Sequence, residues 1–379
     1  MAAAQNKDLS PQQSKDQIKR LEAVIRRSSR AASSQVRAEQ AIVSARRTSA
    51  PSLELQWVGE KSLPGSVLGR ISGLARLKSL SLPPISDTGL ARVRNLPSLE
   101  SLQFAPCRGG SAAMTARGVR ALKRFPKLER LEFYDSCLGP RAVAALGEMT
   151  ALTRLSVTGD PSGFKPGPVP FQKLKALKML GLRQDGIRDA GLAGLPSSVE
   201  SLDLSEDPVT PRGLRALARL PRLQMIILSR DHLGARGLAA LAAVKSLQVI
   251  QADNEAAGFG RGLHFLKGLR RLRQIGLTND GVKDSELAGL PASIENLSLT
   301  GDPITDAGAA ALARLKGLRS LNLSGTRVGP AGVAALAPLK RLHCLQIDDP
   351  RAAKVLLRSH PHLRIPVVKA GGGITRDCG

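Results

Sequence analysis

Aromatic side chains are scarce in this sequence of 379 residues, which contains one Trp, one Tyr and seven Phe. A buried core must therefore be built mainly from Leu, Val and Ala, within a composition that is 42% hydrophobic. The same scarcity argues against a dedicated nucleic-acid site, because proteins that bind single strands stack the bases on aromatic rings.

Long apolar runs are also absent, and no stretch approaches the length of a membrane span. Residues 1–20 contain no apolar segment of the kind found in secretory signal peptides. The four cysteines, Cys107, Cys137, Cys344 and Cys378, form no C-x-x-C pair. Reduced thiols and a cytoplasmic location are predicted, with secretion without a conventional signal peptide as the alternative.

Catalytic signatures are missing as well. The chain contains neither a phosphate-binding G-x-x-x-x-G-K-(S/T) loop nor a G-x-S-x-G nucleophile motif. Its five histidines are scattered, and His360 and His362 lack a nearby cluster of metal-ligand spacing, which predicts surface histidines. We therefore expect no enzyme activity, no catalytic residue, no metal and no cofactor.

A leucine-containing strand signature recurs from Leu55 to Ile365, of the form L-x-x-L-x-L-x-x-(Asp, Thr, Ser or Cys)-x-(Ile, Val or Leu). Each unit is too short to bury its apolar face alone, so neighbouring units must stack. The central strand residues are predicted at positions 55, 80, 102, 131, 155, 180, 202, 226, 250, 275, 297, 321, 345 and, weakly, 365.

The unit lengths themselves repeat every four units. Leu155, Ile250 and Leu345 lie 95 residues apart, and the segment Leu195–Leu202 recurs as Leu290–Leu297. We infer that a block of four units was duplicated twice.

This pattern resembles the leucine-rich repeat family over roughly residues 52 to 369. The segments beginning at Ile85, Ile187 and Ile304 resemble bacterial "DAGL" repeats, which are similar to the GALA-type repeats of plant-pathogen effectors. The resemblance implies an α/β fold: a right-handed solenoid of about 13–14 turns, with a concave parallel sheet and short convex helices. Extracellular animal members carry disulfide-rich caps, and no such cysteine cluster is present.

Aspartate or another small polar residue occupies the ladder position where the family usually has Asn. The ladder residues are Cys107, Ser136, Asp160, Asp185, Asp207, Asp231, Asp280, Asp302 and Thr326. A carboxylate accepts from a backbone N–H but cannot donate as Asn does. Turn structure is the favoured explanation of these aspartates, and a carboxylate metal site is the alternative. Glycines early in the helices, such as Gly213 and Gly308, are expected to allow close approach of helix and sheet.

Three regions are predicted: residues 1–51, the repeats at 52–369, and a flexible tail at 370–379. Residues 1–50 hold ten basic and four acidic residues, a net charge of +6. The apolar residues Ile18, Leu21, Ile25, Ala32, Val36 and Val43 follow helical or heptad spacing. The segment is either a basic amphipathic helix or a disordered leader.

The whole chain has a formal net charge of +25, and its Lys and Arg residues cluster just before the strands. Acidic residues cluster just after the strands, so the two edges of the sheet are expected to carry opposite charge. Cations at the helix ends also complement the helix dipole, which gives the basic edge a structural explanation. If the edge instead binds a nucleic acid or another polyanion, the predicted residues are Arg219, Arg222, Arg270 and Arg271.

Side chains on the concave face are mostly Ser, Thr and Asn, but larger groups gather on neighbouring units. The predicted partner-binding residues are Arg130, Glu132, Tyr134, Arg154, Met179 and Arg183. Tyr, Arg and Met are enriched at protein interfaces. An ordinary solvated sheet face is the alternative.

The leading functional hypothesis is a non-catalytic module that binds a protein partner through its concave face. The first alternative is an adaptor that recruits a target to a host ubiquitin ligase, as the GALA-type resemblance implies. Such effectors carry an F-box before the repeats, and residues 1–50 lack its pattern. The second alternative is binding of an anionic polymer or membrane surface through the basic edge.

Overall fold

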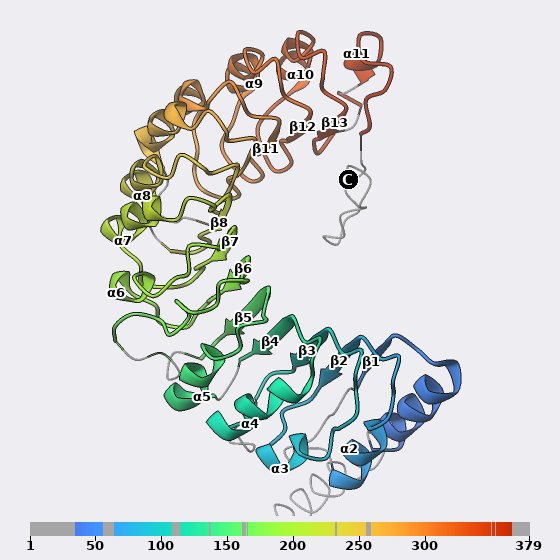
Figure 1. Ribbon diagram of the computed structural model, residues 1–379. Coiled ribbons are helices and arrows are strands. Elements are labelled where there is room, and N and C mark those ends of the chain that lie inside the picture. The colour runs from blue at the N-terminus through green and yellow to red at the C-terminus, as the bar shows by residue number, and fades with distance from the viewer. Residues whose placement is uncertain are drawn as a thin grey trace, which may run out of the picture. The chain divides into compact units, whose positions relative to one another are not determined.

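A computed structural model describes residues 35–55, 64–107, 114–135, 138–160, 164, 166–231, 233–254, 259–349, 351–352 and 354–365. These residues fall into two compact units, Met1–Leu138 and Gly139–Gly379. Strands lie along one side of each unit and short helices along the other (Figure 1).

The first unit contains four parallel strands, which hydrogen-bond to one another in sequence order. They are β1 (Ser52–Glu54), β2 (Ser79–Leu82), β3 (Ser101–Phe104) and β4 (Arg130–Tyr134). Its helices are a helix at residues 35–48, α2 (Gly65–Ile71), α3 (Asp87–Leu90), α4 (Ala116–Ala121) and the 3-10 helix η1 (Leu122–Arg124).

The second unit continues the pattern with nine parallel strands, again paired in sequence order. They are β5 (Arg154–Thr158), β6 (Met179–Gly181), β7 (Ser201–Asp203), β8 (Met225–Ile227), β9 (Val249–Gln251), β10 (Gln274–Gly276), β11 (Asn296–Ser298), β12 (Ser320–Asn322) and β13 (Cys344–Gln346). The α-helices are α5 (Gly139–Leu146), α6 (Asp189–Leu192), α7 (Pro211–Ala216), α8 (Gly234–Leu241), α9 (Asp306–Leu312), α10 (Pro330–Ala335) and α11 (Lys354–Leu357). The 3-10 helices are η2 (Leu217–Arg219), η3 (Gly260–Gly268) and η4 (Asp284–Gly289).

The strand leucines align from repeat to repeat, as the sequence pattern predicts. Leu180, for example, pairs with Leu155 on one side and with Leu202 on the other, and all three are buried. The first strand differs from the prediction, because Leu53 rather than Leu55 pairs with Leu80. Both leucines are buried because side chains two residues apart share one face of a strand, so the two-residue shift costs no burial. The predicted fourteenth strand is represented by a bridge between Cys344 and Arg364.

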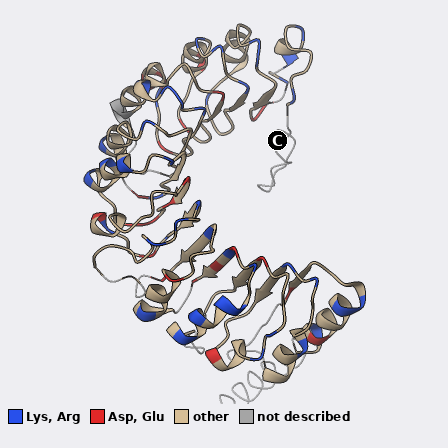
Figure 2. Cartoon of the chain, in the orientation of Figure 1, with Lys and Arg blue, Asp and Glu red and all other residues tan. Residues whose placement is uncertain are grey.

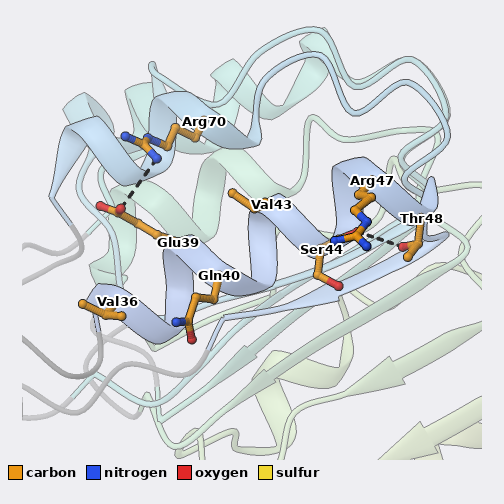
Figure 3. A pocket seen from close by; sticks show the side chains of 8 residues that line it. All are labelled: Val36, Glu39, Gln40, Val43, Ser44, Arg47, Thr48 and Arg70. Carbon is orange, nitrogen blue, oxygen red and sulfur yellow. Dashed lines mark hydrogen bonds and ion pairs between the residues drawn. The ribbon is translucent and has the colours of Figure 1, made fainter.

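The helix at 35–48 covers the start of the first unit, as part of the region predicted to be a helix or a disordered leader. It buries Ala38, Ile42 and Ala45 rather than the apolar stripe noted in the sequence. Val36 and Val43, which belong to that stripe, are exposed and line a pocket of about 620 Å³ (Figure 3). The remaining members of the stripe, at 18, 21, 25 and 32, lie outside the described residues.

Polar contacts fix this helix to the first repeats. Arg46 Nη2 donates to the carbonyl oxygens of Arg70 (2.9 Å) and Ser72 (3.0 Å). Glu39 forms an ion pair with Arg70 at 3.6 Å, which Figure 3 also shows. The helix therefore caps the end of the leucine core.

Aspartates at the first position of several helices tie each helix to the next repeat. The carboxylate of Asp189 accepts from the backbone N–H (2.8 Å) and the hydroxyl (2.6 Å) of Thr210. Thr210 in turn caps α7 by accepting from the N–H of Arg212 (3.2 Å). The same arrangement joins Asp87 to Thr115 and Asp284 to Thr305.

This clamp explains the glycines that recur early in the helices. A Cβ on Gly213 would collide with Oδ1 of Asp189, and one on Gly308 would collide with Oδ1 of Asp284. For these two glycines the nearest atom belongs to an aspartate of the preceding repeat, and core side chains such as Val209 and Ile304 come next. The carboxylate of that aspartate lies at the N-terminus of the helix that contains the glycine.

At the C-terminal end, His360 is buried rather than exposed, which corrects the expectation of a surface histidine. Its Nε2 lies 2.8 Å from the carbonyl oxygen of Leu339, and its Nδ1 lies 2.8 Å from the hydroxyl of Ser359. The imidazole therefore joins the last helix to the repeat before it, while His362 is exposed.

We predict that Gly213→Ala lowers the free energy of unfolding by about 1–3 kcal/mol, because the added methyl group must displace the Asp189 carboxylate. Urea denaturation followed by circular dichroism measures the change. The matched control is Gly69→Ala in α2, where a Cβ meets no atom within 4 Å. Its effect should be neutral or stabilising by up to about 1 kcal/mol. Equal effects of the two substitutions would contradict the clamp.

Candidate functional site

The open face of the sheet carries the side chains that alternate with the buried strand leucines. Three predicted partner-binding residues, Arg130, Glu132 and Tyr134, lie on β4 in the first unit. The Tyr134 hydroxyl donates to Glu132 Oε2 at 2.7 Å, and Arg130 forms an ion pair with Glu100 at 3.4 Å. Tyr134 and Glu132 therefore contact each other along β4, while Arg130 reaches across to the residue before β3.

The other three predicted residues, Arg154, Met179 and Arg183, lie on or next to β5 and β6 in the second unit. Arg154 and Met179 are direct partners in the register of the two strands, and Arg154 Nη2 lies 2.9 Å from the Met179 sulfur. Met179 is 38% exposed, unusually high for a large apolar side chain. The six residues therefore form two groups, one in each unit.

The predicted partner-binding set ends at Arg183 and leaves out an apolar strip that continues from Met179 along the second unit. Met225 and Val249 are register partners on β8 and β9, and Ile227 follows on the same face of β8. All three are half-buried. Most other repeats have Ser or another small polar residue at these positions. The signal in the sequence was the unbroken apolar run Met225–Leu228, which violates the alternation of a half-buried strand.

A charged cluster borders this strip at the edge where the chain leaves the strands. Glu206 Oε1 accepts from Arg183 Nη2 (2.5 Å) and lies 3.4 Å from Arg230 Nη1. The hydrogen bond from Arg183, with the charges of Arg183 and Arg230, lowers the pKa of the Glu206 carboxyl. The cluster therefore keeps a net positive charge, because two guanidinium groups share one carboxylate.

The edge charges differ from the expected opposition of basic and acidic edges. Figure 2 shows Lys and Arg on the helices and loops of both units, but glutamates also stand where the chain enters the strands. Glu100, Glu200 and Glu295 pair there with Lys or Arg at 3.0–3.7 Å. On the other edge, Asp185 and Asp302 are buried, so they add no acidic surface.

The four predicted polyanion-binding arginines divide into two kinds. Arg219 is a structural residue, since its guanidinium donates to the carbonyl oxygens of Leu192 and Leu195. Arg222, Arg270 and Arg271 are exposed. Removing Arg219 would therefore disturb the fold as well as the surface charge.

The ladder aspartates accept backbone hydrogen bonds from the preceding repeat. Oδ1 of Asp207 accepts from the N–H groups of Asp185 and Ile187, both at 3.0 Å. Asp185 does the same for Asp160 (2.8 Å), and Asp302 for Asp280 (2.9 Å). No group of three or more His, Cys, Asp or Glu within the described part of the chain is placed to hold a metal ion.

The second oxygen of these carboxylates has no such partner. Oδ2 of Asp185, Asp207 and Asp302 is buried and makes no hydrogen bond. Burial is the main cause that raises the pKa of Asp185 to about 9, of Asp207 to about 7 and of Asp302 to about 6. Asp185 therefore keeps its proton at neutral pH.

Two cysteines contradict the expectation of reduced thiols. Cys107 and Cys344 are both disulfide-bonded. Cys344 lies on β13 and is completely buried. None of the helices in the described ranges combines the length and apolar character needed to cross a membrane.

Comparison with known proteins agrees with the geometry. A family model described as Leucine Rich repeat matches residues 318–337. A crystal structure of an internalin (inlF) from Listeria monocytogenes is similar, with a TM-score of 0.51 and 16% sequence identity. The similarity covers 86% of this chain and 93% of the internalin chain. No curated protein matches the sequence. The predicted fold, a right-handed α/β solenoid of the leucine-rich repeat type, is therefore confirmed.

We predict that Asp185→Asn stabilises the protein increasingly as the pH rises from about 4 to about 9. The pKa of Asp185 is raised from 3.8 to about 9, so the folded state holds a proton that the unfolded state releases over this interval. The wild-type stability contributed by this proton is complete below pH 4 and is lost as the pH rises to 9. Asparagine removes that dependence, at about 1 kcal/mol per pH unit.

Urea denaturation of both proteins at pH 5 and pH 8 measures the difference. The control is Glu200→Gln, a surface carboxylate that pairs with Lys178 at 3.7 Å. A gain for Asp185→Asn that is no larger at pH 8 than at pH 5 would show that the buried carboxyl is ionised throughout.

Proposed function

We propose that this chain is a non-catalytic protein-interaction module and that β6–β9 of the second unit form its main contact surface. The observation that carries the proposal is the apolar strip of Met179, Met225, Ile227 and Val249, bordered by Arg183, Glu206 and Arg230. Large apolar and arginine side chains in one patch are typical of interface hot spots. Leucine-rich repeats generally present such extended concave surfaces to their partners.

The strand register supports treating the strip as one contact surface, interrupted at β7. Ser201 on β7 is the register partner of both Met179 and Met225, so it lies between them. Strands lie about 4.8 Å apart, so Met179 and Val249 are within about 15 Å of each other. A partner would present an apolar centre to this strip and acidic groups to Arg183 and Arg230.

The second group, on β4, is a further contact surface in this proposal. Tyr134 and Arg130 there offer an aromatic ring and a guanidinium, which are the two side-chain types most enriched at hot spots. An adaptor that recruits a target to a ubiquitin ligase would use the same strand faces for the target. Its ligase-binding segment would lie elsewhere in the chain.

The disulfide bonding of Cys107 and Cys344 supports action outside the reducing cytoplasm, because disulfides persist mainly in oxidising compartments. Secretion therefore becomes the preferred proposal over the cytoplasmic location that the cysteine spacing suggested.

We predict that Met225→Ser and Ile227→Ser each weaken partner binding at least roughly tenfold, equivalent to about 1.4 kcal/mol. Serine is the residue that other repeats place at these positions, for example Ser201 and Ser298, so both variants should fold. Proteins cross-linked to the tagged wild type are identified by mass spectrometry, and the affinity of each variant for them is then measured.

The control for these variants is Phe265→Ser on η3, which removes an apolar side chain that is 52% exposed on the helix side. Its binding should match that of the wild type. Folded Met225→Ser and Ile227→Ser proteins that retain full affinity would move the contact surface away from β8.

A second candidate function, binding of a polyanion, is favoured by the exposure of Arg222, Arg270 and Arg271. Reversing all three charges to Glu should lower the salt concentration that elutes the protein from immobilised heparin, since fewer phosphate-like charges are then neutralised. Arg219 is left in place because it supports the fold. Unchanged elution would exclude these three arginines, and the Met225→Ser protein serves as the control of unaltered charge.

A further inference from the structure

An arginine that joins two helices recurs at the 95-residue spacing of the duplicated block. Arg314 Nη2 donates to the carbonyl oxygens of Leu287 (2.6 Å) and Leu290 (2.8 Å) in the preceding repeat. Arg219 makes the equivalent pair of contacts to Leu192 and Leu195. In these two blocks one guanidinium satisfies two carbonyl groups at the end of a helical segment, which is a purely structural role.

The first copy of this arginine, Arg124, is different. Its Nη2 donates to the carbonyl oxygen of Leu90 at 2.5 Å, which corresponds to the contact with Leu287 in the third block. Arg124 has no equivalent of the second hydrogen bond, the one that Arg314 donates to the carbonyl oxygen of Leu290. The reason is that the chain after Leu90 takes a longer path. Where the later blocks continue Ala-Gly-Leu, this block has Ala-Arg-Val-Arg-Asn-Leu, ending at Leu96.

The longer path places a second arginine beside the first. Arg94 Nε donates to the carbonyl oxygen of Ala91 at 2.6 Å, so both guanidinium groups lie at the C-terminal end of α3. The Arg94 backbone is also fixed, since its N–H donates to the Ser72 hydroxyl (2.9 Å) and its carbonyl oxygen accepts from the N–H of Gly73 (3.3 Å).

A pocket of about 530 Å³ opens between the two arginines. The described residues that line it are Arg94, Asn95, Leu96, Pro97, Arg124 and Pro126. This lining contains two positive charges and no carboxylate. Partial burial, together with the charge of Arg94, lowers the pKa of Arg124. The two like charges are therefore held together at a cost that a bound anion would offset.

We propose that this pocket binds the dianionic phosphate group of a phosphate monoester or inorganic phosphate. Two guanidinium forks match the charge and the several acceptor oxygens of phosphate, and the carbonyl bonds of Arg94 and Arg124 hold them in place. Pro97 and Pro126, which are exposed, supply apolar walls for the ester group. The later blocks make the same connection without a second arginine, through the shorter segments Ala193–Leu195 and Ala288–Leu290.

The test is isothermal titration of the full chain with inorganic phosphate and with phenyl phosphate, in a chloride buffer of constant ionic strength. We expect saturable binding at one site, and Arg94→Gln should raise the Kd at least tenfold. Arg94→Lys should recover part of the affinity, since it keeps the charge but not the fork. Arg236→Gln, which removes an exposed arginine of α8 in the second unit, should leave the Kd within about twofold.

Tighter binding of phenyl phosphate than of inorganic phosphate would identify an ester as the ligand, and equal binding would identify free phosphate. The proposal is overturned if the wild type shows no saturable binding, or if Arg94→Gln and Arg236→Gln weaken it equally. Benzoate binding as tight as phenyl phosphate would also overturn it, because a single carboxylate would then suffice.

Discussion

Hydrogen bonding from each repeat to the next is the constraint on which the rest of the structure depends. No repeat can bury its own leucines, so stability comes from stacking, and stacking needs a fixed step. The Oδ1 atom of Asp207, which holds two backbone N–H groups of the previous repeat, sets that step beside the strands. On the helix side, the carboxylate of Asp189 holds the cap of the following helix. Between these two anchors the strand leucines fall into register.

Both anchors use carboxylates, and their environments differ. The Asp189 carboxylate has both oxygens engaged by Thr210, near the positive end of the helix dipole of α7. The Asp185 carboxylate has one oxygen buried without a hydrogen bond, so it is held as the neutral acid. An Asn at that position would have an amide group in place of the unsatisfied oxygen. The substitution of Asp for Asn thus couples the stability of the ladder to pH.

The face of the sheet is free to vary because the anchors lie at its edges. On β8 the half-buried positions of the strand face hold Met225 and Ile227, whereas on β12 they hold Ser320 and Asn322, with the same backbone register. The arginines also differ in role. Arg219 and Arg314 donate hydrogen bonds to backbone carbonyl oxygens of the preceding repeat, whereas Arg94 lies in a segment that the later blocks lack. The positions that differ between repeats are therefore the candidates for binding, because the repeated positions are needed for stacking.

The sequence by itself determined the repeat, its register from β2 to β13 and the small polar residues of most of the strand face. These follow from a local period and from the need of every repeat to bury the same leucines. Only the tertiary structure decided which arginines form hydrogen bonds to the backbone of a neighbouring repeat. Arg219 and Arg222 lie three positions apart and look alike in the sequence, but only Arg219 reaches carbonyl groups of the preceding repeat. The role of Gly213 was also hidden, because its neighbour, the Asp189 carboxylate, lies more than twenty residues away and meets it only when the repeats stack.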